Sequence, residues 1–150
     1  MDLNSPILLL AEDSPADVYI VQRSLRQHLR SFELQVVEDG EKAIRMIEAM
    51  DADDATPCPS ILILDLNLPK RSGQEILQSI RRSRRCSRIP VVVLTASDSP
   101  ADQAAIAKYG ATAYFCKPIE LDQFMELGKI VKDALALSPG ETAGSGQAIP

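Results

Sequence analysis

Four charged residues stand where this chain could carry phosphoryl chemistry. Glu12 and Asp13 follow one run of aliphatic residues, Asp65 follows another, and Lys117 follows a short β-like segment. Three carboxylates brought together repel one another unless a divalent cation or protonation offsets their charge. An aspartate can attack a phosphoryl group as a nucleophile, and carboxylate oxygens suit Mg²⁺. We therefore predict that Asp65 accepts a phosphoryl group and that Glu12 and Asp13 hold Mg²⁺.

Two further side chains fit the same chemistry. Lys117 supplies a positive point charge for phosphate oxygens. Thr95 ends a run of β-branched residues, and its hydroxyl can donate a hydrogen bond to a phosphate oxygen. Contacts to a charged acceptor are the stronger class of hydrogen bond, so both residues are candidate phosphoryl ligands.

These residues need a parallel sheet to bring them together. Runs of four or five aliphatic residues bounded by polar ones indicate strands that are covered on both faces. Segments with apolar residues at spacings of three and four separate these runs and predict helices. The expected strands are 7–11, 32–37, 61–65, 91–95 and 112–116, and the expected helices are 15–30, 41–50, 74–82, 100–109 and 121–137.

This alternation predicts an α/β fold with a doubly wound parallel sheet and helices on both faces, because parallel neighbours need right-handed crossovers. Ligands bind beyond the carboxyl ends of such strands, where the charged residues fall. A chain of 150 residues suits one domain, which we expect over 1–137. Residues 138–150 are rich in Gly, Ser, Ala and Pro and are expected to form a flexible tail.

The composition argues against two classes of function. A net charge of −5 disfavours a general nucleic-acid or anionic-membrane binder, since those need a basic footprint. No apolar stretch approaches the roughly 20 residues that span a bilayer, and the first residues lack the basic start of a secretory signal. We therefore expect a cytoplasmic protein without a membrane partner.

The sequence says less about the state of its three cysteines and about the role of one cluster of arginines. Cys58, Cys86 and Cys116 are odd in number and show no Cys-x-x-Cys spacing, so reduced thiols are expected. The basic cluster is predicted to be a solvated surface near a helix C-terminus, with contact to nucleic acid or an acidic partner as the alternative. Its members are Arg81, Arg82, Arg84, Arg85 and Arg88.

Over about residues 5–137, the chain resembles the receiver domain of bacterial two-component response regulators. The matching motifs, which are highly specific in this order and spacing, are Leu10-Ala11-Glu12-Asp13, Asp65-Leu66-Asn67-Leu68-Pro69 with Gly73, Thr95-Ala96, and Tyr114-Phe115-Cys116-Lys117-Pro118. Within that family, segment 65–73 and the longer loop before the third strand are similar to the small solitary receivers that partner bacteriophytochrome kinases.

The resemblance implies a flavodoxin-like fold with five helices and the strand order 2-1-3-4-5. It implies that a sensor histidine kinase or histidine phosphotransfer protein phosphorylates Asp65, and that the Asn67 backbone carbonyl joins the Mg²⁺ ligands. Thr95 and Tyr114 would form the switch, and the Lys117–Pro118 peptide would be cis. The fourth helix, fifth strand and fifth helix would form a face for partners or a homodimer. No DNA-binding output domain follows Lys117, so regulation is expected to pass through protein contacts.

Two alternatives stay open beside a stand-alone phosphoacceptor that at most catalyses its own phosphorylation and dephosphorylation. A phosphohydrolase of the haloacid dehalogenase type also uses a strand-end aspartate and Mg²⁺. Those enzymes usually carry a second aspartate two residues after the nucleophile, where this chain has Asn67, and that departure counts against turnover. A degenerate receiver that works only as a scaffold is the third hypothesis, although the acidic set, the threonine and the lysine are intact.

Overall fold

The structure is a computed structural model that describes residues 5–96 and 99–137. These residues form helices around a five-stranded parallel sheet with the strand order β2-β1-β3-β4-β5. The predicted fold class and strand order are confirmed. The predicted tail, 138–150, lies outside the described residues. The strands are β1 Ile7–Ala11, β2 Glu33–Val37, β3 Ile61–Asp65, β4 Val91–Thr95 and β5 Ala113–Cys116. The helices are α1 Pro15–His28, α2 Gly40–Ala52, α3 Gly73–Arg81, α4 Pro100–Ala107, α5 Leu121–Phe124 and α6 Leu127–Leu135.

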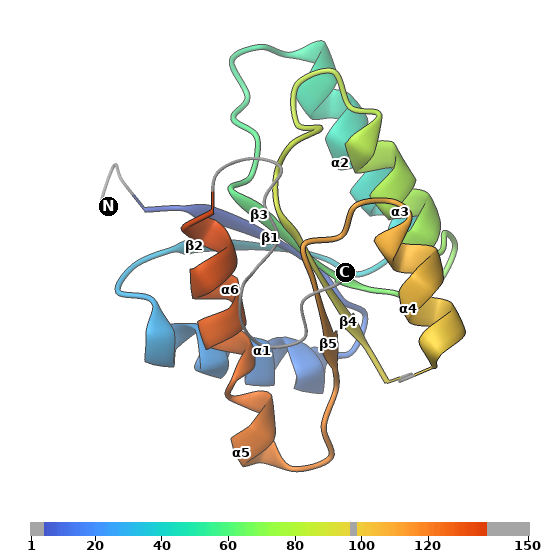
Figure 1. Cartoon of the computed structure of the whole chain (residues 1–150). Coiled ribbons are helices and arrows are strands. Elements are labelled where there is room, and N and C mark those ends of the chain that lie inside the picture. The colour runs from blue at the N-terminus through green and yellow to red at the C-terminus, as the bar shows by residue number, and fades with distance from the viewer. Residues whose placement is uncertain (1–4, 97–98, 138–150) are drawn as a thin grey trace.

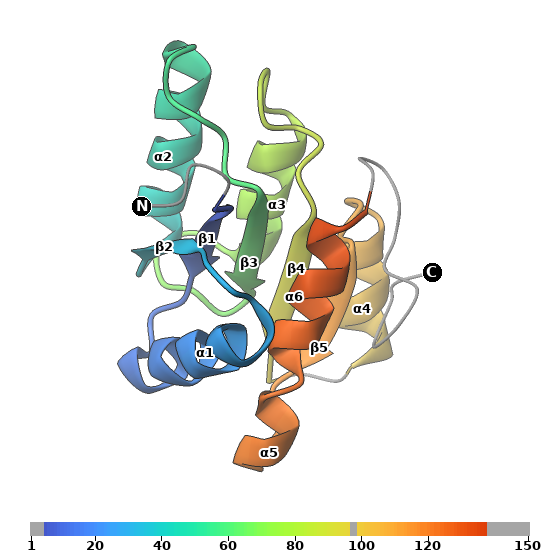
Figure 2. The same ribbon diagram turned by 90° about the vertical axis from the view of Figure 1, so that its left-hand side faces the viewer.

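Helices cover both faces of the sheet, with α2, α3 and α4 on one side and α1, α5 and α6 on the other (Figures 1 and 2). Successive strand residues point to opposite faces, so each strand serves two cores. In β1, for example, Leu9 packs into the core beneath α2 and α3, whereas Leu10 packs into the core beneath α1 and α6. This double burial explains the unbroken aliphatic runs in the sequence.

Side-chain caps fix the starts of four helices. In each case the residue before the helix accepts a hydrogen bond from the backbone N–H three residues further on, which satisfies one of the free donors of the first turn. The capping residues are Ser14, Asp39, Ser72 and Ser99. Because α1 and α3 begin close after β1 and β3, their caps also fix the loops at the carboxyl edge of the sheet.

The helix predicted over 121–137 is present as two segments, α5 and α6. Ser24 of α1, which is fully buried, causes the break. Its hydroxyl donates to the Met125 carbonyl at 2.7 Å and accepts from the Gly128 N–H at 2.7 Å. These two backbone groups therefore bond to α1 instead of extending one continuous helix.

Gly128 lets α6 approach α1 at this point, and Gly128→Ala is expected to destabilise the protein. An added Cβ would lie 2.2 Å from the Ser24 carbonyl oxygen, which is backbone and cannot rotate away. Overpacking of this kind costs about 1–3 kcal/mol of unfolding free energy. Urea denaturation measures the unfolding free energy of Gly128→Ala, and Lys129→Ala, an exposed position on the same helix, is the control. An unchanged midpoint for the glycine variant would contradict the close approach.

The expectation of three reduced thiols is wrong for two of them. Cys58 and Cys86 form a disulfide with Cα atoms 5.7 Å apart, whereas Cys116 is not part of a disulfide. The two cysteines are 28 positions apart in the sequence and lie in different loops. A search for local Cys-x-x-Cys spacing could not detect a pair that only the tertiary fold brings together.

The arginine cluster is only partly a solvated surface. Arg82 and Arg88 are exposed, as predicted. Arg81 instead donates to the carbonyls of Ser87, Ile89 and Gly110, at 3.1, 2.7 and 2.7 Å. Two further members, Arg84 and Arg85, bond to the last turn of α2 and to the loop that follows it. Arg84 is nevertheless exposed, so the prediction of solvation is wrong only for Arg81 and Arg85, which are partly buried.

Candidate functional site

The predicted site residues meet at the carboxyl edge of the sheet. Glu12 directly follows β1, and its N–H donates to the Val37 carbonyl of β2 at 3.0 Å. Asp65 is the last residue of β3. Lys117 directly follows β5, and its N–H donates to the Thr95 carbonyl at the end of β4 at 2.7 Å. Extensions of the strand ladders therefore aim these side chains into one small volume.

Lys117 is the centre of the cluster. Its Nζ donates to Glu12 Oε1 at 2.6 Å, to Asp17 Oδ2 at 2.8 Å and to Asp65 Oδ2 at 3.0 Å. The Glu12 side chain is fully buried, and those of Asp65 and Lys117 are only 6% and 14% exposed. The Lys117 ammonium group therefore contacts three carboxylates in a place that is largely shielded from solvent.

Asp17 is the member that the sequence analysis missed. It lies in the first turn of α1, where an acidic residue is explained by the helix dipole alone. Its N–H donates to the Ser14 hydroxyl that caps the helix, at 3.3 Å. The only available signal was that α1 starts at the sheet edge directly after Glu12, which places its first turn over the site.

Burial and mutual repulsion shift the acid–base properties of the cluster. Burial raises the pKa of Glu12 to about 7, with Asp65 adding to the rise and the hydrogen bond from Lys117 opposing it. Burial alone would lower the pKa of Lys117, but hydrogen bonds to Asp17, Glu12 and Asp65 outweigh it and raise that pKa. The lysine therefore stays charged, whereas Glu12 is poised to exchange a proton for another cation near neutral pH.

Three carboxylates fit the ligand set of a hard divalent cation. Glu12, Asp13 and Asp65 each offer an oxygen, and these oxygens lie within 4.8 Å of one another. Asp13 is exposed and reaches the cluster from the solvent side. Oxygen ligands in this number suit Mg²⁺ or a similar ion that keeps several waters. The donor set therefore fits a divalent metal, as predicted.

The other predicted residues flank this cluster. Asn67 is exposed in the loop after Asp65, and its N–H donates to Asp65 Oδ1 at 2.9 Å, which fixes the carboxylate. Thr95 and Tyr114 are each 1% exposed. Tyr114 lies in β5 and packs into the core beneath α2 and α3. The structure thus places Tyr114 inside, on the strand that leads to Lys117.

Gly73 shapes the loop that follows Asp65. Its N–H donates to the Leu66 carbonyl at 3.1 Å, and a Cβ at this position would lie 2.6 Å from the Leu66 Cα. Only glycine allows this close return of the chain, which leads directly into α3. Lys70, at the tip of the loop, has a φ of 72°, a left-handed conformation that is unusual outside glycine.

The expected cis peptide is absent. No peptide bond within 5–96 and 99–137 is cis, so the Lys117–Pro118 bond is trans. A bond before proline favours trans by about 0.5–1 kcal/mol. The trans bond is compatible with the lysine contacts to all three carboxylates.

A doubly wound sheet of this order, with an acidic cluster and a lysine at its carboxyl edge, defines a phosphoacceptor receiver. The family model described as "Response regulator receiver domain" matches residues 8–129, and the chain belongs to this family. Its members accept a phosphoryl group and are not enzymes in their own right, and they partner histidine kinases or phosphotransfer proteins. The chain accordingly has a phosphoacceptor role in two-component signalling.

Individual relatives agree with this assignment. The chain is similar to response regulator Rcp1 of Synechocystis sp., with 35% identity over 81% of this chain and 82% of the relative. A crystal structure of a phosphorylated cyanobacterial phytochrome response regulator, RcpA, matches with 29% identity, a TM-score of 0.79 and coverage of 94% and 99%. The bacteriophytochrome response regulator RtBRR matches with 31% identity, a TM-score of 0.71 and coverage of 97% and 84%.

These similarities extend to the predicted subgroup of phytochrome-associated receivers. They do not favour the phosphohydrolase or the scaffold alternative.

Within the described residues, none of the helices has both the length and the apolar character needed to cross a membrane.

Proposed function

We propose that Asp65 is the phosphoacceptor and that Lys117 binds the incoming phosphoryl group. The contact of Lys117 Nζ with both Asp65 and Glu12 carries this proposal, because it places a charged donor beside the candidate nucleophile. A phosphoryl oxygen held by this ammonium would lie next to Asp65 Oδ2. The Asn67 N–H holds the other carboxylate oxygen, so the nucleophile is oriented before the donor arrives.

Mg²⁺ is the proposed cofactor, with Glu12, Asp13, Asp65 and the Asn67 backbone carbonyl as ligands. Bound there, a divalent cation offsets the repulsion between the carboxylates and the phosphoryl oxygens. The clustering of three carboxylate oxygens supports this assignment. The crystal structure of Rcp1, which is 34% identical, is of a Mn²⁺-bound form, and this supports a divalent metal as the cofactor.

Thr95 and Tyr114 are proposed to convert phosphorylation into a change of surface. Thr95 would bind a phosphoryl oxygen, and Tyr114 lies on the neighbouring strand β5, in ladder register with Val93. Phosphorylation would bias a two-state equilibrium of the face formed by α4, β5 and the α5–α6 pair. That face would bind a partner or a second copy of the chain.

The proposed setting is a cytoplasmic response regulator whose receiver domain spans 1–137. It would receive its phosphoryl group from a sensor histidine kinase, directly or through a phosphotransfer protein, and at most catalyse its own phosphorylation and dephosphorylation. The similarity to phytochrome response regulators favours a light-sensing kinase as the donor. Output would pass through protein contacts of the face formed by α4, β5 and the α5–α6 pair.

Incubation with acetyl phosphate tests the proposal. With Mg²⁺ we expect one acid-labile phosphate per chain, mapped by mass spectrometry to the peptide that contains Asp65. Chelation of the metal before incubation is expected to reduce incorporation to background. Steady-state release of phosphate from ordinary monoesters, without a stable phosphorylated chain, would instead support the phosphohydrolase.

A further inference from the structure

The disulfide lies at the end of the sheet opposite the phosphoryl site. Cys58 is in the loop that leads into β3, and Cys86 is in the loop that leads into β4. We call these two segments, residues 53–60 and 82–90, the distal loop pair. Because β3 and β4 are parallel neighbours, the disulfide joins their amino ends, whereas Asp65 and Thr95 stand at their carboxyl ends.

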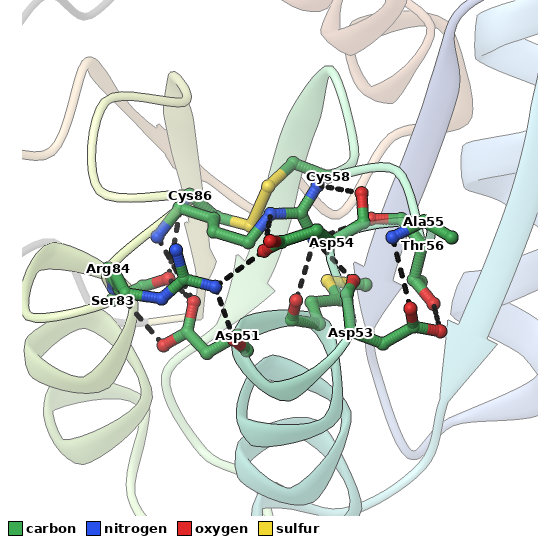
Figure 3. Close-up of polar contacts among 11 residues, drawn as sticks. Asp51, Asp53, Asp54, Ala55, Thr56, Cys58, Ser83, Arg84 and Cys86 are labelled. Carbon is green, nitrogen blue, oxygen red and sulfur yellow. Dashed lines mark hydrogen bonds and ion pairs between the residues drawn. A yellow bond between two sulfur atoms is a disulfide. The ribbon is translucent and has the colours of Figure 1, made fainter.

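A polar network joins the distal loop pair independently of the sulfur atoms (Figure 3). The Asp51 carboxylate, at the end of α2, accepts from the Ser83 hydroxyl at 2.6 Å. It also accepts from the backbone N–H groups of Arg84 and Arg85, each at 3.1 Å. The Ser83 hydroxyl in turn accepts from the Cys86 N–H at 3.0 Å, which fixes the backbone of this cysteine.

Two arginine side chains complete this network. Arg84 Nη2 donates to Asp54 Oδ1 at 2.6 Å and to the Asp51 carbonyl at 2.7 Å. Arg85 Nη1 donates to the carbonyls of Met50, Asp53 and Thr56, at 2.6, 2.9 and 2.6 Å. These bonds hold the segment before Cys58 against the segment that contains Cys86. The two cysteines would therefore stay close together after reduction.

We propose that Cys58 and Cys86 form a reversible redox site, at which thiol–disulfide exchange with a dithiol opens and closes a covalent link between two loops that stay docked in both states. A cytoplasmic setting is proposed above for this protein. Disulfides are rare in the cytoplasm, and those that form there are mostly transient or redox-sensing. A pair that needs no refolding to close suits that role better than that of a permanent staple.

The exchange proceeds through Cys58. This residue is partly exposed, whereas Cys86 is only 1% exposed. A thiolate of the dithiol attacks the Cys58 sulfur and forms a mixed disulfide, and Cys86 leaves as a thiolate that takes up a proton. The second thiol of the reductant then displaces Cys58. Two electrons and two protons pass to the pair, and the dithiol becomes a disulfide.

Equilibration in glutathione buffers of graded ratio, followed by alkylation and peptide mapping, tests the redox site. We expect one alkylated thiol, Cys116, in the oxidised protein and three after reduction with dithiothreitol. The oxidised form should melt about 5–15 °C higher, because the link restrains the unfolded chain. Circular dichroism of the two forms should be the same. Three reactive thiols under oxidising conditions, or loss of structure on reduction, would overturn the proposal.

Three variants make the test specific. Cys116→Ser should keep both states and the melting difference, whereas Cys58→Ser should melt at one temperature in all buffers. Asp51→Ala removes the centre of the network and should slow re-formation of the disulfide by glutathione disulfide roughly tenfold. Exposed Glu48→Ala on the same helix is its control. Closure of Asp51→Ala at the wild-type rate would show that the loops are not held in place, contrary to the proposal.

Discussion

Asp65→Asn is expected to abolish the incorporation of acid-labile phosphate from acetyl phosphate and Mg²⁺. The amide has nearly the size of the carboxylate, but it lacks the anionic oxygen that attacks phosphorus. The amide also presents one carbonyl oxygen where the carboxylate presents two, so binding of a divalent cation should weaken as well. The measurement is phosphate bound per chain after a fixed incubation, with the intact mass as a second readout.

The same variant is expected to fold. Lys117 keeps its contacts with Glu12 and Asp17, at 2.6 and 2.8 Å, and the oxygen of the introduced amide can still accept from the Asn67 N–H. Exposed Asp122→Asn is the matched control and should incorporate phosphate at the wild-type level. Equal labelling of the Asp65 and Asp122 variants would place the phosphate elsewhere and refute the assignment of Asp65.

Most of the site was predictable because its residues lie at the ends of strands or directly after them. An aliphatic run of the right length marks a buried strand, and the residue that follows it falls at the edge of the sheet. This local rule located Glu12, Asp65, Thr95 and Lys117, and the alternation of strands and helices predicted that these edges coincide. Each of these predictions needed only a few neighbouring residues.

Features that depend on contacts between distant segments were not predictable in this way. In the sequence, Asp17 looks like an ordinary acidic residue in the first turn of a helix. Its contact with Lys117 becomes visible only in the folded structure. The break between α5 and α6 depends on Ser24, which is about 100 positions earlier. The Cys58–Cys86 disulfide and the hydrogen bonds from Arg85 to the carbonyls of Asp53 and Thr56 likewise require two loops to meet. Hydrophobic periodicity carries no information on such pairings.

Lys117→Ala is expected to lower the unfolding free energy by about 3–5 kcal/mol at pH 8 without divalent cations. The lysine is the shared partner of three carboxylates, two of which have almost no exposure to solvent. Its removal leaves negative charge buried without compensation, which costs more than the pair itself contributed. Urea denaturation measures the change, and exposed Lys132→Ala serves as the control for loss of a lysine alone.

Two conditions should restore much of that loss and so identify its electrostatic cause. Without the lysine, the folded-state pKa of Glu12 should rise above its present value of about 7, which already exceeds that of the unfolded chain. A carboxyl group whose folded-state pKa lies above its unfolded-state value destabilises the fold as pH rises towards that folded-state pKa. The variant should therefore go on losing stability above pH 7, where the wild type no longer does, so the deficit should shrink as pH falls from 8 towards 7 and level off below 7. Millimolar Mg²⁺ should also reduce it, by neutralising the carboxylates. A deficit that is the same at pH 5 and pH 8, and with and without Mg²⁺, would show that lost packing is responsible and not buried charge.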